Sequence, residues 1–318
     1  MKLEFLKIDG LKTRDYAELA IHSKIPIYTN FSVEDLEKKL QENITKYKTE
    51  VVIVARKNNE LLGCLALYGF NELKMAQVWN WHPLVLPNKN QNKIAEELIR
   101  QSINFSKERG QKQLTIDFVN INSQTKNSLQ NYEKWYNKNG ITFFSEELFY
   151  QFDLSELFSE EIILPNEFEI KPLLSFNWKT IYQCWDAIFS SSTDRFFKSL
   201  SNQGKEDYFD ESWKKATELI DEGSLALVKN EKLIGISRIL SIYNPSDGCL
   251  APIGILPEFR GEGLAKKLLL SSMVNLQKIG YKTISLFVDS ENLSAINLYE
   301  TLGFNKIHSI KSYLGDIV

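Results

Sequence analysis

The chain repeats itself at a nearly constant distance, and this repeat restricts its fold more than any other feature. PLVLPNKNQNKIAEELI in the first half corresponds to PIGILPEFRGEGLAKKL in the second, and ERGQKQLTIDFV corresponds to QKIGYKTISLFV. Pro87 and Pro257 are 170 residues apart, and so are Gly110 and Gly280. A constant offset across a strand, a helix and a further strand predicts that one type of domain occurs twice.

Each half also contains a predicted β-hairpin. ARKNNELLG (55–63) and LVKNEKLIG (227–235) both read as an apolar strand, a polar turn and a second apolar strand. Helices are expected at residues 11–24, 32–43, 175–190 and 206–222, and a further helix should bury Leu264, Leu268, Leu269, Ser272, Leu276 and Ile279 on one face. We therefore predict a mixed α/β fold of two tandem domains, each with a central mixed, largely antiparallel sheet flanked by helices.

The boundary between the domains is expected in the acidic segment DLSELFSEEIILPNEF. FEIKPL, which begins at Phe168, restarts the pattern that LEFLKI begins at Leu3. A chain of 318 residues also exceeds what one hydrophobic core commonly supports. We place the boundary near residues 155–166, which gives an N-terminal domain over 1–155 and a C-terminal domain over 166–318.

Composition excludes several classes of protein. The net charge of -3 and the pI near 5.8 argue against a general nucleic-acid surface. No apolar run approaches the roughly 20 residues of a membrane span, and the first residues lack a signal peptide, so a cytoplasmic location is expected. Neither the three cysteines nor the three histidines form a ligand motif, so no disulfide framework and no metal site is predicted.

The segment IGILPEFRGEGLAKKLLL (253–270) places an arginine and two glycines directly before an apolar helix. A helix N-terminus presents unpaired N–H groups that attract an anion, and glycine lets the backbone approach a ligand closely. This pattern predicts a phosphate-binding loop. Its donors would be the backbone N–H groups of Gly261, Gly263, Leu264 and Ala265, with Arg260 as an added cation.

A dinucleotide-binding turn is an alternative interpretation of the same loop. GEGLAK lies between a strand and a helix, and Asp289 ends the following strand, as in a βαβ unit. That fingerprint requires a third small residue where Lys266 stands, and no series of parallel βαβ units surrounds it.

Two motifs together resemble the GNAT acetyltransferase superfamily. ILPEFRGEGLA is similar to its acyl-CoA pyrophosphate motif, and LFVDSENLSAINLYETLGF resembles its next segment, in which a strand, an Asn-containing loop and a tyrosine-bearing helix follow one another. Tandem arrangements occur in mycothiol synthase-like members. The resemblance extends over nearly the whole chain as two units, but its specific motifs lie in residues 250–304. It implies acetyl-CoA (coenzyme A) as cosubstrate and no metal.

The resemblance also implies where the thioester lies. It would follow the strand at about residues 250–255, where a backbone N–H polarises the thioester carbonyl. Pro252 has no N–H, which leaves Ile253, Gly254 and Ile255 as the candidate donors.

The resemblance also implies roles for two residues of the second motif, Tyr299 and Asn292. Tyr299 matches the position whose phenol protonates the departing thiolate, although a packed aromatic would also explain a tyrosine there. Asn292 either caps the helix that carries Tyr299 or binds the pantetheine amides.

The general base is not specified by the sequence. Asp247 and Glu258 are candidates, but each also suits a solvated turn, and a chain of water molecules would serve equally. FSSSTDRFF (189–197) falls where the superfamily shapes its acceptor pocket, so Arg195 is a candidate contact and a plain loop the alternative.

The first half departs from the motif. NKNQNKIA (88–95) has no glycine where the second half has Gly261 and Gly263, and Lys93 corresponds to Gly263. Tyr136 aligns with Tyr299 at a distance of 163 residues, so the first half carries seven more residues in the intervening loop. We predict a degenerate unit that binds no coenzyme A and supports the second unit or encloses the acceptor.

These expectations define an N-acetyltransferase that transfers acetyl from acetyl-CoA to a primary amine by direct attack. No serine or cysteine has a recognisable nucleophile arrangement, which disfavours a covalent acyl-enzyme. A catalytically silent acyl-CoA-binding or regulatory protein of the same fold is the alternative. The acceptor, a small molecule or a peptide amine, and the oligomeric state are not specified by the sequence.

Overall fold

A computed structural model of the chain divides into two compact units. Unit 1 comprises Met1–Glu146 and His308–Val318, and unit 2 comprises Glu147–Ile307. The structure describes residues 2–6, 12–29, 31–47, 51–69, 75–121, 123–157, 162–192, 197–198, 200–242 and 246–317.

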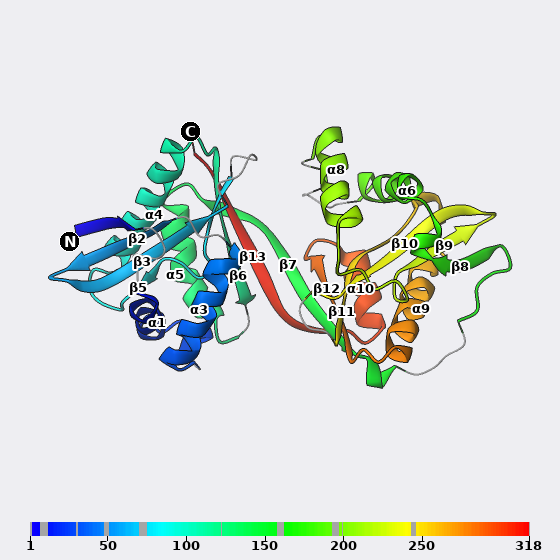
Figure 1. Cartoon of the computed structure of the whole chain (residues 1–318), viewed down its shortest axis with the longest axis horizontal. Coiled ribbons are helices and arrows are strands. Elements are labelled where there is room, and N and C mark those ends of the chain that lie inside the picture. Colours follow the sequence, from blue (N-terminus) through cyan, green and yellow to red (C-terminus); the bar gives the residue numbers. More distant parts are fainter. Residues whose placement is uncertain are drawn as a thin grey trace. The chain divides into compact units, whose positions relative to one another are not determined.

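Unit 1 is a mixed sheet with helices on both faces. Its strand order is β1 (Lys2–Leu6), β2 (Val51–Lys57), β3 (Glu60–Tyr68), β4 (Met75–Val78), β6 (Gln113–Ile121) and β13 (Asn305–Asp316), with β5 (Leu84–Val85) beside β3. Within the described residues of this sheet, β4 and β6 pair in parallel and the other strand pairs are antiparallel. Figure 1 shows α1 (Thr13–His22) and α3 (Val33–Tyr47) on one side of this sheet, and α4 (Gln91–Glu108) with α5 (Lys126–Asn137) on the other. The short α2 (Pro26–Thr29) joins α1 to α3.

Unit 2 repeats this plan. Its strand order is β7 (Thr142–Asp153), β12 (Thr283–Asp289), β11 (Asp247–Ile255), β10 (Lys232–Leu240), β9 (Leu225–Lys229) and β8 (Phe168–Pro172). Its helices are α6 (Trp178–Ser190), α8 (Asn202–Phe209), α9 (Leu264–Lys278) and α10 (Leu293–Thr301), with short helical turns η2 (Leu154–Glu156), η3 (Leu173–Ser175), η4 (Asp210–Lys214) and η5 (Pro257–Phe259). The predicted mixed α/β fold is confirmed in both units.

The last strand of each half of the sequence pairs inside the other unit. β7 follows the first half but pairs with β12 through residues 147–153, and β13 follows the second half but pairs with β6 through residues 309–316. The units therefore change at residues 146/147 and 307/308, whereas the sequence repeat places the boundary near 155–166. Unit 1 is thus completed by β13 from the second half of the sequence, and unit 2 is completed by β7 from the first half.

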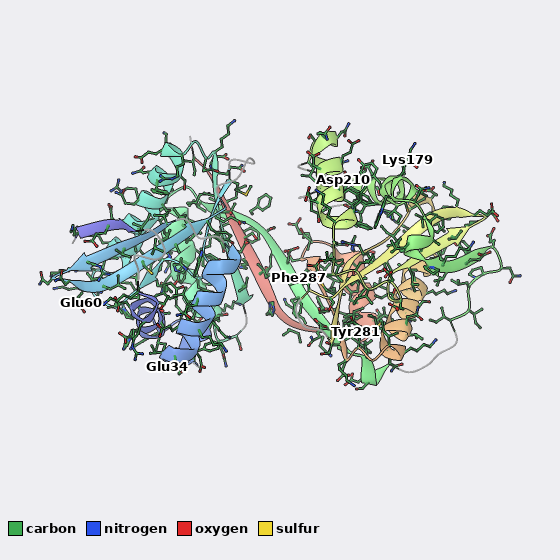
Figure 2. The ribbon with its side chains drawn as sticks, viewed as in Figure 1. Glu34, Glu60, Lys179, Asp210, Tyr281 and Phe287 are labelled. Atoms are coloured by element: carbon green, nitrogen blue, oxygen red, sulfur yellow. The ribbon has the colours of Figure 1, made fainter. Side chains whose placement is uncertain are left out.

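Apolar side chains fill the interior of each unit, and charged side chains lie on the outer faces of its helices. Glu34, Lys179 and Asp210 are exposed examples (Figure 2). The predicted helix over 206–222 is wrong in its second part, because α8 and the π-helical turn η4 end at Lys214. All three cysteines are buried free thiols, and among the described helices none is long and apolar enough to cross a membrane.

Candidate functional site

β11 separates from β12 halfway along its length. The two strands pair in parallel from Asp247 with Thr283 to Leu250 with Leu286, and β11 then continues to Ile255 beside β10 alone. The register against β10 shifts between Ser237 and Ile239, so that Ala251 and Pro252 form a bulge. Beyond Leu250, the N–H and C=O groups of β11 that point away from β10 have no neighbouring strand to bond to among the described residues. These backbone groups are therefore open to a ligand.

The hydrogen-bonding pattern shows which N–H groups face the opening. Leu256 N–H donates to the carbonyl of Ile234 at 2.8 Å, so Leu256 faces β10. Alternation along an antiparallel strand then turns Gly254 towards β10 as well, and turns Ile253 and Ile255 away from it. A Cβ on Gly254 would lie 2.4 Å from Ile188 of α6, so Gly254 serves close packing. Of the three predicted donors, the geometry therefore favours Ile253 and Ile255 over Gly254.

Arg238 supports the bulge and was not singled out from the sequence. Its side chain is only 4% exposed, and its guanidinium donates to the carbonyl of Ala251 at 3.0 Å and to the carbonyl of Ser212. It also lies over the ring of Trp213 at 4.5 Å. Burial lowers the pKa of Arg238 to about 10, which leaves it charged at neutral pH. The signal in the sequence was a single arginine inside the apolar strand IGISRIL.

The glycine loop, residues 256–263, leads from β11 into α9. Gly261 has φ +84° and Gly263 has φ +71°, and a Cβ added at either position would meet nothing within 4 Å. The glycines are thus required by backbone angle, and the space beside them is open. From Gly261 to Lys266 the backbone N–H groups donate to no group of the described residues, and α9 has no side-chain cap. The predicted donors Leu264 and Ala265 lie in this run.

Arg260 lies beside the loop, but its guanidinium is held by the protein. It donates to the carbonyl of Ile255 at 2.9 Å, to the carbonyl of Ile188 at 3.0 Å and to Ser191 Oγ at 2.9 Å. Ile188 and Ser191 lie at the C-terminus of α6, where a positive charge is favourable. In the structure Arg260 therefore ties the end of β11 to α6, in addition to supplying positive charge near the loop.

Tyr299 lies on α10 with its phenol ring buried. The residue is 6% exposed and packs in one apolar cluster with Leu250 of β11, against which Ile253 is also packed. Its hydroxyl has no hydrogen-bond partner among the described residues. The hydroxyl oxygen is nevertheless not completely shielded from solvent, so a ligand can reach it. Burial raises the pKa of Tyr299 far above its ordinary value, so the phenol keeps its proton.

The other predicted residues are placed as follows. Asn292 is the N-cap of α10, and its side chain accepts a hydrogen bond from Ala295 N–H at 3.2 Å. Asp247 is buried and accepts hydrogen bonds from Thr283 Oγ1 at 2.7 Å and Ser285 Oγ at 2.8 Å. Its interpretation as a solvated turn residue is wrong, because these bonds make it a link between β11 and β12. Glu258 is exposed and lies 3.8 Å from Lys232 Nζ. Arg195 lies outside the described residues.

The corresponding positions in unit 1 are differently used. α4 begins after Asn90, and Asn92 near its start accepts a hydrogen bond from Trp135 Nε1 at 2.9 Å. No residue from 88 to 95 has a positive φ. Tyr136 is fully buried, and its hydroxyl donates to the carbonyl of His82 at 2.8 Å. At the described positions that correspond to the glycine loop and to Tyr299, unit 1 therefore has neither a left-handed glycine nor an unpaired phenol.

Comparison with known proteins gives a family match within unit 2. The profile of the Acetyltransferase (GNAT) family matches residues 185–304, which lie within unit 2. The chain is 46% identical over 52 residues to a mycothiol acetyltransferase from Renibacterium salmoninarum, and this match spans 16% of the chain and 15% of that relative. It is 30% identical over 105 residues to the ribosomal protein bS18 alanine N-acetyltransferase of Haemophilus ducreyi, over 32% of the chain and 71% of that relative.

A solved structure shares the tandem plan. The tandem GNAT protein from the clavulanic acid biosynthesis pathway has a TM-score of 0.57 and 14% identity, with 100% of this chain and 99% of that chain covered. At that identity the likeness concerns the fold. The chain belongs to the GNAT acetyltransferase family, with two GNAT-type units in tandem.

Proposed function

We propose that this protein transfers an acetyl group from acetyl-CoA to a primary amine, and that unit 2 carries the reaction. The observation that carries the proposal is the run of unpaired backbone N–H groups from Gly261 to Lys266, directly after a strand that has left its neighbour. Acetyl transfer is the activity for which the GNAT family is named, and the unpaired N–H groups suit the phosphates of acetyl-CoA.

The glycine loop would hold the pyrophosphate of coenzyme A. The unpaired N–H groups of Leu264 and Ala265 replace part of the water shell of the phosphates, and the dipole of α9 favours their negative charge. The open space at Gly261 and Gly263 admits the phosphates close to the backbone. Arg260 would act here mainly as a positioning residue, because its hydrogen bonds fix the loop against α6.

The acyl group would lie along the separated part of β11. An N–H that faces away from β10, that of Ile253, would donate to the thioester oxygen, and the developing negative charge of the transition state strengthens this bond. The corresponding bond at Ile255 is available to the pantetheine chain. Asn292 would contribute by capping α10 and so holding Tyr299 in place.

The chemical step is a direct substitution at the thioester carbon. The amine nitrogen forms the new C–N bond, the C–S bond breaks, and the sulfur leaves as a thiolate that takes the proton of the Tyr299 hydroxyl. The amine proton passes to water, because Asp247 is bound to two hydroxyls and Glu258 is an exposed side chain beside Lys232. A proton from water then restores the Tyr299 hydroxyl, so no net proton is gained or lost. The raised pKa of Tyr299 ensures that its acid form is present throughout the neutral range.

The experiment is a measurement of thiol release from acetyl-CoA over a panel of primary amines. The relatives are named for different acceptors, mycothiol and an alanine of a ribosomal protein, so no acceptor follows from them. The panel therefore includes amino acids, polyamines, aminoglycoside antibiotics, amine-bearing thiol conjugates and a peptide with N-terminal alanine. Release that depends on one amine class, and that is lost in Gly263→Lys, is the expected result.

A thermal-shift titration with acetyl-CoA separates the enzyme from a silent binder. A ligand at about 100 times its Kd adds about 2.7 kcal/mol to the free energy of unfolding. Stabilisation by acetyl-CoA without thiol release from any amine would favour the silent acyl-CoA-binding protein. Absence of stabilisation would remove coenzyme A from the proposal altogether.

A further inference from the structure

Unit 1 contains a cavity of about 460 Å³ between its sheet and the helices α1 and α3. The described residues that line it all belong to unit 1. Five aromatic rings form much of its wall, those of Tyr16, Tyr28, Phe31, Tyr68 and Trp79. A volume of this size is within the range of small-molecule sites, which are largely apolar with a few polar groups.

One carboxylate of the described lining faces this cavity, and no described cation pairs with it. Asp117 on β6 accepts a hydrogen bond from Ser312 Oγ at 2.6 Å, and Ser312 lies directly opposite it on β13. Within the described residues no cation pairs with Asp117, and its second oxygen has no donor. Burial raises the pKa of Asp117 above its ordinary value. A partly buried carboxylate of this kind is stabilised by a bound cation.

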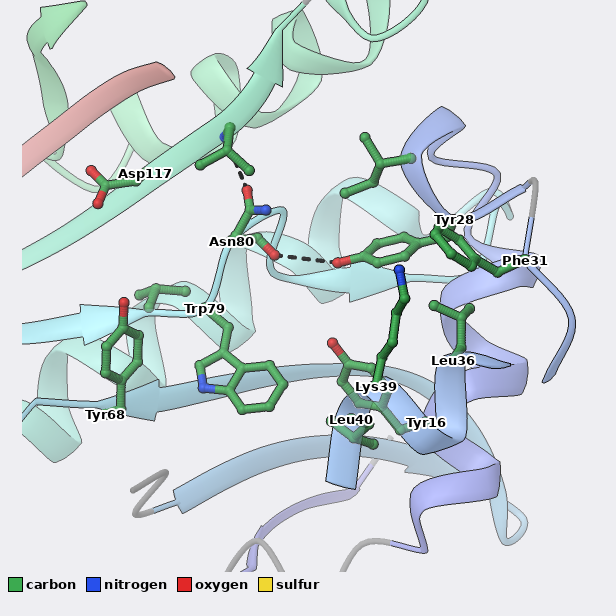
Figure 3. Close-up of a pocket in the computed structure, with 13 residues that line it drawn as sticks. Tyr16, Tyr28, Phe31, Leu36, Lys39, Leu40, Tyr68, Trp79, Asn80 and Asp117 are labelled. Carbon is green, nitrogen blue, oxygen red and sulfur yellow. Dashed lines mark hydrogen bonds between the residues drawn. The ribbon is translucent and has the colours of Figure 1, made fainter. Parts of the chain in front are cut away.

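Two other polar groups shape the cavity. Trp79 is 9% exposed, and its indole N–H has no partner among the described residues. Lys39 is exposed, with Nζ 4.1 Å from the centre of the Phe31 ring. Figure 3 shows Asp117 and the Tyr68 hydroxyl on one side of the cavity, and Lys39 with Phe31 on the other. A ligand cation is thus favoured at the Asp117 side and repelled at the Lys39 side.

These features belong to unit 1 and are not inherited from the repeat. At the offset of 170 residues, Asp117 corresponds to Phe287, which packs against Phe149 at 4.9 Å in unit 2. In unit 1 residues 79–83 separate β4 from β5. In unit 2 the corresponding segment is the single uninterrupted strand β11. Trp79 and Asn80, which line the cavity, lie in that break. The carboxylate and the break coincide in the unit that lacks the glycine loop.

We propose that this cavity binds a small molecule with a single ammonium group on an apolar or aromatic body. The ammonium group would pair with Asp117, and the body would lie against the aromatic rings, whose faces also attract a cation. Lys39 disfavours a second positive charge. The site is independent of the acetyl transfer proposed for unit 2.

The test is calorimetry on the full chain at pH 7 without acetyl-CoA. The probes are phenethylamine, its neutral counterpart 2-phenylethanol and the anion 3-phenylpropionate. We expect phenethylamine to bind at least about tenfold more tightly than either of the others, because a hydrogen bond to a charged group contributes at least that factor. Asp117→Asn keeps the shape of the side chain and should lose this preference.

Ser312→Ala is the matched control, because it removes the hydrogen bond to Asp117 and keeps its charge. It should bind phenethylamine within about threefold of the parent, and unchanged thermal midpoints should show that both variants fold. Equal affinity for the amine and the alcohol would overturn the proposal, and so would absence of amine binding at millimolar concentration. Unchanged amine binding in Asp117→Asn would place the amine elsewhere and also overturn it. Thiol release reports on unit 2 separately, so the two proposals fail independently.

Discussion

Removing one hydroxyl from each of two aligned tyrosines should separate catalysis from stability. Tyr299→Phe deletes a hydroxyl that has no partner in the described protein, so the free energy of unfolding should change by less than about 0.5 kcal/mol. If this hydroxyl protonates the leaving thiolate, turnover should fall by about 10²-fold. The Kd of acetyl-CoA should change little, because the proton transfer occurs only as the C–S bond breaks.

Tyr136→Phe should show the opposite behaviour. It deletes a hydroxyl that donates to the carbonyl of His82 at 2.8 Å in a fully buried position, and it leaves that carbonyl unpaired. The cost should be about 1–3 kcal/mol. For a unit of this size each kcal/mol corresponds to about 2–4 °C in the midpoint of unfolding. Turnover of the folded variant should equal that of the parent.

The assay is single-turnover thiol release with the best amine of the panel, together with thermal unfolding of both variants. Single-turnover conditions remove product release from the measured rate, and saturating concentrations of both substrates remove binding from it. If Tyr299→Phe releases thiol as fast as the parent, Tyr299 is a packing residue and the proposed acid is wrong. If Tyr299→Phe also unfolds several degrees earlier, its hydroxyl has a structural partner and the argument from the unpaired hydroxyl fails.

Three further predictions concern the loop, its support and pH. Calorimetry should give one coenzyme A per chain, with binding greatly weakened by Gly263→Lys, which places a side chain at φ +71°, and unaffected by Lys93→Gly; two per chain would refute the degenerate first unit. Arg260→Met should lower the affinity for coenzyme A and the midpoint of unfolding together, since both the loop and the end of α6 lose their link, and a change in affinity alone would show a purely electrostatic role. Burial lowers the pKa of His82 to about 4 from an ordinary value near 6.5, so the folded protein holds it neutral while the unfolded chain takes up a proton. Stability should therefore be unaffected above about pH 6.5 and fall by up to about 1.4 kcal/mol per pH unit between pH 6.5 and 4, and urea unfolding of His82→Gln should lack this slope.

The glycine loop could be predicted from the sequence because its requirements are local. Only glycine readily adopts positive φ, so Gly261 and Gly263 before an apolar helix indicate both the turn and the open helix end. The helix itself was predicted well, except at its end. Ile279 was expected on the buried face but is 43% exposed, because α9 ends at Lys278 and the helical spacing no longer applies.

The partners of the charged side chains could not be predicted in the same way. Arg260 meets the carbonyl of Ile188, 72 residues earlier, and Arg238 meets that of Ser212, 26 residues earlier. Such pairings depend on how helices pack on the sheet, and no spacing in the sequence encodes them. The exchange of β7 and β13 has the same origin, because a repeat reveals which segments are alike but not which strands pair.

The differences between the two units follow a consistent physical pattern. In unit 2 the strand that corresponds to β4 and β5 is continuous. Among the described residues, the N–H groups at the start of the helix after it and the tyrosine hydroxyl have no partner. In unit 1 the strand is broken at residues 79–83, and its own backbone uses the tyrosine hydroxyl, since Tyr136 bonds to the carbonyl of His82 in that break. The break that holds the Tyr136 hydroxyl is also the segment that supplies Trp79 and Asn80 to the aromatic cavity. The hydrogen bond of Tyr136 and the wall of the cavity therefore depend on the same five residues, so a change that restored a continuous strand in unit 1 should close the cavity as it released the Tyr136 hydroxyl.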